Sequence, residues 1–123
     1  MQRITIAKNT LELPVDSRKQ KTAFPPNYVH SLDSTHMMLT SLEMEKRGLT
    51  FAAVHDSYWT HACDVDEMSV ILRDKFVDLY SKPLLQNLKS DLEIRFPGSE
   101  FPPIPATGKL DLEQVRKSTY FFQ

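Results

Sequence analysis

Short apolar runs and polar stretches alternate along this chain, and their spacing predicts several helices with a few short strands. Residues 2–7 alternate polar and apolar side chains, which is the period of a half-buried strand, and residues 8–23 are polar and indicate a solvated loop. Pro25-Pro26 predicts extended backbone, because a residue that precedes a proline is biased away from the helical region. Residues 1–30 are therefore expected to form a strand, a loop and a proline turn.

A helix is predicted over residues 31–47, where apolar residues recur three and four positions apart. Three short polar residues can cap its start: Ser31, Asp33 and Ser34. Gly48 is a favourable stop, because glycine readily takes the left-handed conformation that ends many helices. His30 would then precede the cap and point along the helix axis, whereas His36 would lie on the helix surface.

Residues 49–61 predict a β-hairpin. Residues 49–54 form an apolar run typical of a buried strand, and residues 58–60 can return beside it. Asp56 would then be held rigidly at the tip, facing a cleft. A single carboxylate presented in this way suits Mg²⁺, which keeps several waters and takes one or two protein carboxylates. The alternative is that His55-Asp56-Ser57 is an ordinary polar turn.

Residues 64–96 predict two helices. Asp64 or Asp66 can cap the first, which would extend to about Lys82. Its core-facing stripe comprises Met68, Ile71, Leu72, Phe76, Leu79 and Tyr80. Pro83 is suited to the first turn of the second helix.

Residues 97–123 begin with a proline-rich stretch that should end helical structure. Asp111 can cap a short helix that runs to Arg116, and the aromatic end of the chain is expected to be docked. The fold class expected is α+β, with helices packed on a small antiparallel hairpin. Because two or three strands rarely make a covered sheet, the chain is expected to be a piece of a larger domain.

Composition narrows the range of functions. The 123 residues correspond to about one domain, and 41% hydrophobic with 25% charged residues is compatible with a packed core. A net charge of −1 lacks the basic footprint of a nucleic-acid-binding domain, so any such contacts must be local. Cys63 is the single cysteine, which excludes an internal disulfide and favours a reducing compartment. No apolar run approaches the ~20 residues of a membrane span, so no membrane partner is expected.

Two other chemistries are weakly supported. A zinc site could draw on the four histidines and Cys63, but His61 and Cys63 lack the paired spacing of structural zinc sites. Hydrolysis by Ser57 with His55 is also disfavoured, since no glycine-rich elbow surrounds the serine.

Three ordered blocks carry a resemblance to a known family. They are Pro25–His36 (PPNYVHSLDSTH), Val54–Ala62 (VHDSYWTHA) and the terminal Tyr120-Phe121-Phe122. Together they resemble the C-terminal end of the single-subunit phage-type RNA polymerases. Tyr58-Trp59 after His-Asp-Ser is similar to the mitochondrial and organellar branch.

The resemblance implies a right-hand polymerase, of which this chain supplies part of the palm and adjoining fingers. Asp56 matches the second of two metal-binding aspartates, and His55 matches its neighbour, for which a positioning role is expected. Two Mg²⁺ ions would serve an in-line phosphoryl displacement, because charge builds on the attacking and leaving oxygens.

The resemblance also implies how nucleic acid is bound. His30, Ser31 and Asp33 match a segment that approaches the RNA–DNA hybrid, where contacts to 2′-hydroxyls are expected. Phe121 and Phe122 match an aromatic C-terminal foot near the active site. The implied partners are template DNA, nascent RNA, ribonucleoside triphosphates and the rest of the polymerase chain, in the matrix of the mitochondrion or another organelle.

The family's first metal-binding aspartate and its nucleotide-binding lysine and tyrosine belong before Met1. The isolated chain is therefore expected to be inactive and, because its apolar faces would be exposed, to associate. The alternative is a non-catalytic binding or assembly module in which His55-Asp56 is a structural turn.

Overall fold

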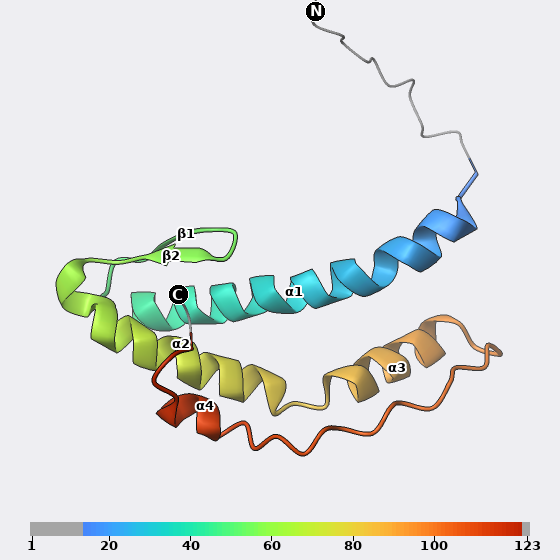
Figure 1. The fold of residues 1–123 in the computed structure, drawn as a ribbon. Coiled ribbons are helices and arrows are strands. Elements are labelled where there is room, and N and C mark those ends of the chain that lie inside the picture. Colours follow the sequence, from blue (N-terminus) through green and yellow to red (C-terminus); the bar gives the residue numbers. More distant parts are fainter. Residues whose placement is uncertain (1–13, 122–123) are drawn as a thin grey trace, which may run out of the picture. The chain divides into compact units, whose positions relative to one another are not determined.

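The structure, a computed structural model, describes residues 14–121, so the strand expected at residues 2–7 lies outside the described part. Four helices and one two-stranded antiparallel hairpin are found there, which confirms the α+β class (Figure 1). The chain divides into two compact units, residues 1–32 and residues 33–123. No helix in the described part is long and apolar enough to cross a bilayer.

Helix α1 (Ser17–Lys46) is much longer than the predicted helix at residues 31–47. It begins where the Asp16 carboxylate accepts hydrogen bonds from the backbone N–H groups of Arg18 and Lys19, at 3.0 and 3.1 Å. Such a side-chain acceptor at the residue before a helix satisfies N–H groups that lack intrahelical partners. The loop predicted for residues 8–23 is therefore wrong from residue 17 onward.

Pro25 and Pro26 lie inside α1, so the expectation of an extended turn there is wrong. The fixed φ of proline, about −65°, is itself a helical value, which allows the helix to pass through both residues. Two amide donors are nevertheless lost. The carbonyls four residues earlier belong to Lys21 and Thr22, which are exposed and can be hydrated instead. The predicted helix caps are also wrong, because the helix continues through them. Their residues, Ser31, Asp33 and Ser34, lie in mid-helix.

The end of α1 agrees with the prediction. Gly48 has φ +73°, and its N–H donates to Glu45 O at 2.9 Å. The N–H of Leu49 donates to Met44 O, also at 2.9 Å. These two bonds form a Schellman motif, in which a left-handed glycine lets two terminal carbonyls find donors. Leu49 then turns in to pack against the core.

The core of the second unit lies between the C-terminal half of α1 and helix α2 (Val65–Tyr80). Its centre consists of Met44, Met68, Ile71 and Leu72. The buried residues of α1 are four positions apart: His36, Thr40 and Met44. This spacing places them on one face. Most of the predicted stripe of α2 is buried, together with Val77, which the stripe did not include.

Strands β1 (Ala52–Val54) and β2 (Ser57–Trp59) follow α1, and a 3-10 turn (Ala62–Asp64) leads into α2. Helix α3 (Leu84–Arg95) has no fully buried residue, and Pro83 lies just before its first turn. Irregular backbone follows through the proline-rich stretch, as predicted. Helix α4 (Gln114–Lys117) begins near Asp111, whose carboxylate accepts the Glu113 N–H at 3.1 Å. In Figure 1, α4 lies beside α2.

Candidate active site

The hairpin presents His55 and Asp56 at its tip. The strands pair Ala52 with Trp59, Ala53 with Tyr58 and Val54 with Ser57, so the turn consists of these two residues alone. His55 has φ +55°, the only positive φ of a non-glycine residue in the described part of the chain. Tight two-residue turns require φ > 0 at the first turn position, where glycine, asparagine or aspartate is usual. The prediction that Asp56 lies at a hairpin tip is confirmed.

One face of the hairpin is packed and the other is exposed. The ring of Tyr58 lies 5.4 Å from that of Phe51, and both pack against the core. The Thr60 hydroxyl donates to Thr50 O at 2.7 Å and closes the open end. On the other face, Val54 is 59% and Trp59 is 51% exposed. The expectation of a buried strand over residues 49–54 is therefore wrong, because β1 is shorter and has only one covered face.

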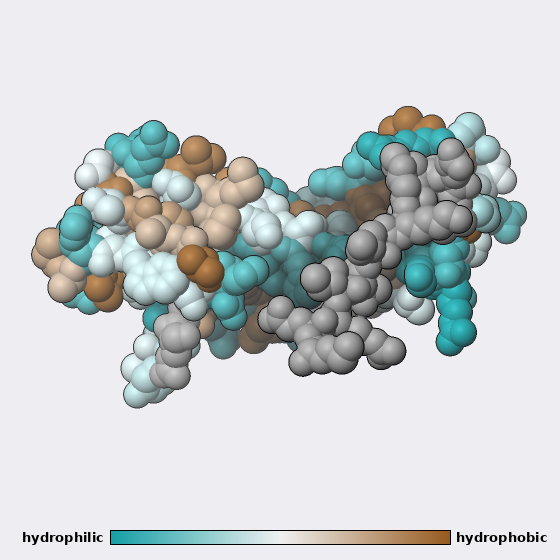
Figure 2. All heavy atoms as spheres, turned by 90° about the horizontal axis from the view of Figure 1, so that it is seen from above, coloured by the Kyte–Doolittle hydropathy of each residue, from teal (hydrophilic) through white to brown (hydrophobic). Residues whose placement is uncertain are grey.

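That outer face is visible at the surface. In Figure 2, apolar side chains gather on the left, where Figure 1 places the hairpin and the start of α2. His55 and Asp56 are themselves exposed. The tip is therefore accessible to a ligand, while the packed face fixes its position against the core.

The charge of Asp33 acts on two tyrosines, Tyr58 in the hairpin and Tyr80 in α2. The pKa of Tyr58 is raised, first because burial disfavours the phenolate and then because Asp33 and Asp56 are negatively charged. Burial also raises the pKa of Tyr80, with further contributions from the charge of Asp33 and from a hydrogen bond to its carboxylate. The structure therefore brings Asp33 and Asp56 close to the same phenol. Sequence reasoning did not foresee this arrangement, since Tyr80 appeared only as a core residue.

The prediction that His36 lies on the helix surface is wrong. Its side chain is only 4% exposed and lies between α1 and α2. Its Nε2 lies 2.8 Å from Leu72 O, a carbonyl that can only accept, so the ring nitrogen is the donor. Its ring meets that of Phe76 edge to face, with centroids 5.7 Å apart, and tilts against Tyr58 at 6.5 Å. His36 therefore joins both helices to the strand that follows Asp56.

His30 and Ser31 belong to the first unit, within α1. His30 is exposed, but it lies in mid-helix and not before a cap, so the expected direction along the helix axis is wrong. The Ser31 hydroxyl donates to Tyr28 O at 2.6 Å. In the same unit, the rings of Phe24 and Tyr28 stack with centroids 6.1 Å apart.

Phe121, the last residue that the structure describes, is docked as predicted. Phe121 packs against the core, and its ring lies 5.0 Å from that of Phe76 in an edge-to-face arrangement. Phe122 lies outside the described residues. Phe121 and His36 therefore both contact Phe76.

Residues 14–121 contain no group of three histidine, cysteine or acidic side chains that could hold a metal ion. His61 and Cys63 are exposed, and the Cys63 thiol donates to the Asp64 carboxylate at 3.4 Å. The accessible Asp56 carboxylate is a hard oxygen ligand of the kind that Mg²⁺ takes once or twice from a protein. Asp56 thus fits as one contributor to a magnesium site.

Comparison with known proteins gives a consistent result. A family model described as DNA-dependent RNA polymerase matches residues 1–100. The DNA-directed RNA polymerase 1B, mitochondrial, of Nicotiana tabacum is 52% identical over 99% of this chain. The DNA-directed RNA polymerase 2, chloroplastic/mitochondrial, of Arabidopsis thaliana is 57% identical over 85% of it.

The chain is short beside these two relatives, since it spans 12% of the first and 10% of the second. It spans 77% of a further relative from Nicotiana tabacum, DNA-directed RNA polymerase 1A, which is 52% identical over 122 residues. The family model covers most of the chain, and two of these relatives match 99% of it. The chain therefore belongs to the DNA-dependent RNA polymerase family.

Proposed function

We propose that this chain is the C-terminal catalytic portion of a DNA-directed RNA polymerase that transcribes organellar DNA. The observation that carries the proposal is the accessible Asp56 at a rigidly packed hairpin tip, in a chain that matches organellar polymerases over nearly its whole length. The reaction is template-directed nucleotidyl transfer, in the matrix of a mitochondrion or another organelle. The partners are template DNA, nascent RNA, ribonucleoside triphosphates and the rest of the polymerase.

In this proposal Asp56 holds Mg²⁺ together with a carboxylate from another part of the polymerase. When bound, a pair of such ions neutralises charge on the attacking and leaving oxygens of the displacement. The hairpin, part of the palm, contributes position: Tyr58 and Phe51 fix its base, so the Asp56 carboxylate does not have to be ordered when substrate arrives. Because this chain supplies one of the two carboxylates, the isolated chain is inactive.

His55 acts as a positioning residue in this scheme. Its left-handed conformation costs about 1–2 kcal/mol relative to ordinary backbone. Strain of this kind persists where the surrounding structure enforces it, and it concentrates at functional sites. Here it orients the peptide that carries Asp56 into the turn.

The nucleic-acid contacts of the proposal lie on α1 and at the chain end. His30 is exposed and suited to a base edge or a 2′-hydroxyl of the RNA–DNA hybrid. Ser31 and Asp33 follow on the next positions of the same helix. Phe121 belongs to the aromatic foot proposed near the active site, to which the sequence adds Phe122.

The test is nucleotide addition by the intact polymerase that contains this chain. Asp56→Asn keeps the size of the side chain but removes its charge. Metal stabilisation of the transition state contributes several kcal/mol, so activity should fall by about 10³-fold or more. Asp66→Asn, at an exposed position in the first turn of α2, is the matched control and should stay within about twofold of the unmodified enzyme.

The alternative, a binding or assembly module with a structural turn, makes the opposite forecast. Asn is at least as good a turn residue as Asp, so Asp56→Asn would then leave nucleotide addition unchanged. Activity of the isolated chain above background, abolished by Asp56→Asn, would contradict the inactivity proposed for it.

A further inference from the structure

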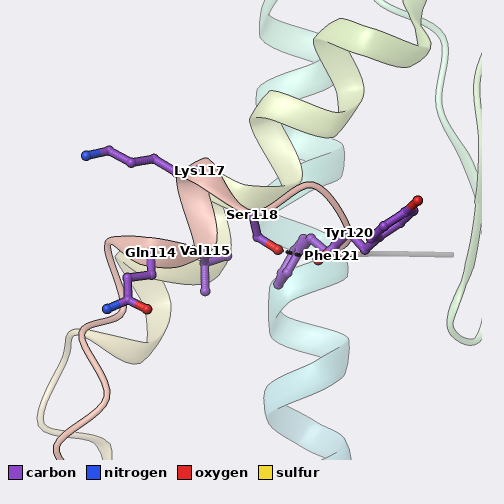
Figure 3. A pocket seen from close by; sticks show the side chains of 6 residues that line it. All are labelled: Gln114, Val115, Lys117, Ser118, Tyr120 and Phe121. Carbon is purple, nitrogen blue, oxygen red and sulfur yellow. Dashed lines mark hydrogen bonds between the residues drawn. The ribbon is translucent and has the colours of Figure 1, made fainter.

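The C-terminal arm, defined here as residues 114–121, is too short to hold its own conformation. It consists of the four-residue α4 and the irregular residues that follow (Figure 3). Nucleation of an isolated helix is unfavourable, and helices shorter than about 12 residues are marginal in water. The arm is therefore held by what it touches, and its contacts on α2 decide where Phe121 lies.

Arg73 of α2 makes the central contact. Its Nη1 donates to Val115 O at 2.8 Å and to Ser118 O at 2.5 Å. These carbonyls lie in the last turn of α4 and directly after it, where a helix has few backbone donors of its own. Val115 O also accepts the Ser118 N–H, but at 3.4 Å. Arg73 thus caps the C-terminus of α4 from a different helix, 42 to 45 residues away in sequence.

The same guanidinium also lies over the ring of Phe121. The Cζ of Arg73 is 5.6 Å from the ring centroid, within the range of a cation–π contact. A single side chain therefore touches the arm at its helix, at the residue after the helix and at its aromatic end. A lysine cannot reproduce this, because an ammonium lacks the planar fork that bonds two carbonyls while it stacks on a ring.

A second arginine reaches from the arm to α2. Arg116 of α4 pairs with Asp74 and Asp78 of α2, and its Nε also lies 2.9 Å from Glu113 of its own segment. These pairs are open to solvent and are weakened by salt. Arg73, in contrast, is partly buried and bonds to the backbone, so its bonds fix the path of the chain.

We propose that Arg73 is the positioning residue of the C-terminal arm and thereby of the aromatic foot of the polymerase. This inference rests on the proposed function in one respect, the place of the foot near the active site. The anchoring itself is independent of catalysis. Arg73 acts through Phe121 and the arm, and it has no contact with substrate in this scheme.

The first experiment measures amide hydrogen exchange in the intact polymerase with Arg73→Gln and Arg73→Lys. Loss of the Arg73 bonds should loosen α4 and speed exchange of the amides that donate within the arm by about tenfold or more. These are the amides of Val115, Arg116 and Ser118. The amides of Met68 to Leu72, in the core part of α2, should change little. Arg47→Gln is the matched control, because Arg47 pairs with Glu43 and Glu67 and does not touch the arm.

Three results would overturn the anchoring. They are unchanged exchange in the arm, an equal increase in Arg47→Gln, or an increase spread evenly through α2, which would indicate a general structural role. Restoration of slow exchange by Arg73→Lys would also contradict the proposal, because charge alone would then be sufficient.

The second experiment measures nucleotide addition. Arg73→Gln should lower kcat more than it raises KM, since a displaced foot leaves substrate binding in place. In a polymerase truncated after Lys117, the same substitution should have no further effect. Additive losses in that background would show that Arg73 does not act through the arm. Full activity of Asp56→Asn would instead refute the proposed function while leaving the exchange result intact.

Discussion

His36 offers the most direct test of how the fold supports the hairpin. Replacing it by alanine removes the donor to Leu72 O and the ring between Phe76 and Tyr58. The hydrogen bond contributes about 1 kcal/mol and the edge-to-face contact about 0.5–1.5 kcal/mol. The cavity left at this 4% exposed position adds a cost of similar size. The free energy of unfolding should therefore fall by about 2–4 kcal/mol, a large part of a typical total of about 5–15 kcal/mol.

The assay is urea unfolding of the chain at low micromolar concentration, followed by circular dichroism. In thermal unfolding followed by the same signal, the melting temperature should fall by roughly 10 °C, since about 1 kcal/mol corresponds to roughly 4 °C at this size. His30→Ala, six positions earlier on the same helix but exposed, is the control and should change the free energy by less than about 0.5 kcal/mol. If both alanine variants lose equally little, His36 does not join α1 to α2 in the way described.

Two further predictions concern α1. The pKa of Glu43 is lowered, first by a hydrogen bond from Arg47 and then by one from Lys75. The Glu43 carboxylate therefore stabilises the fold at pH values above its unfolded pKa. This contribution is lost as the pH falls through the lower pKa of the folded state. Glu43→Gln should flatten the loss of stability in acid between about pH 4.5 and lower values; Glu45→Gln, on the exposed side of the helix, should not, and equal curves for the two variants would contradict this. Replacing Pro25 and Pro26 by alanine restores two amide donors and should slow amide exchange over residues 17–32, because proline costs about 3 kcal/mol in a helix interior. Unchanged exchange there would mean that the prolines do not limit the helix.

Much of the site follows from local sequence. An apolar run, a polar pair and a second short run specify a hairpin with Asp56 at its tip, because strand period and turn chemistry act over a few residues. Gly48 ends α1 for an equally local reason, the left-handed conformation that the Schellman motif requires. The three family blocks then identify the polymerase, since their residues and order are visible in the chain itself.

The first thirty residues show the limit of local rules. A pair of prolines in a polar stretch predicts a break, yet α1 passes through it with Asp16 as its cap. The sequence does contain the cap, Asp16 before Ser17. Pro25-Pro26, however, is the stronger local signal and predicts a break in the helix. Helix propensity is a weak prior that the rest of the structure can override.

The sequence by itself determined the hairpin, most of the stripe of α2 and the candidate metal ligand, because each depends on residues a few positions apart, and its three ordered blocks indicated the family. Only the tertiary structure decided that His36 donates to Leu72, that Asp33 and Asp56 both act on Tyr58, and that Arg73 caps α4. Their partners lie tens of residues away in sequence, and a periodic pattern specifies which face is buried but not which group lies opposite. Arg73 stands beside the apolar stripe of α2 in the sequence, but nothing local indicates its partners. Its contacts with Ser118 and Phe121 depend on the tertiary structure.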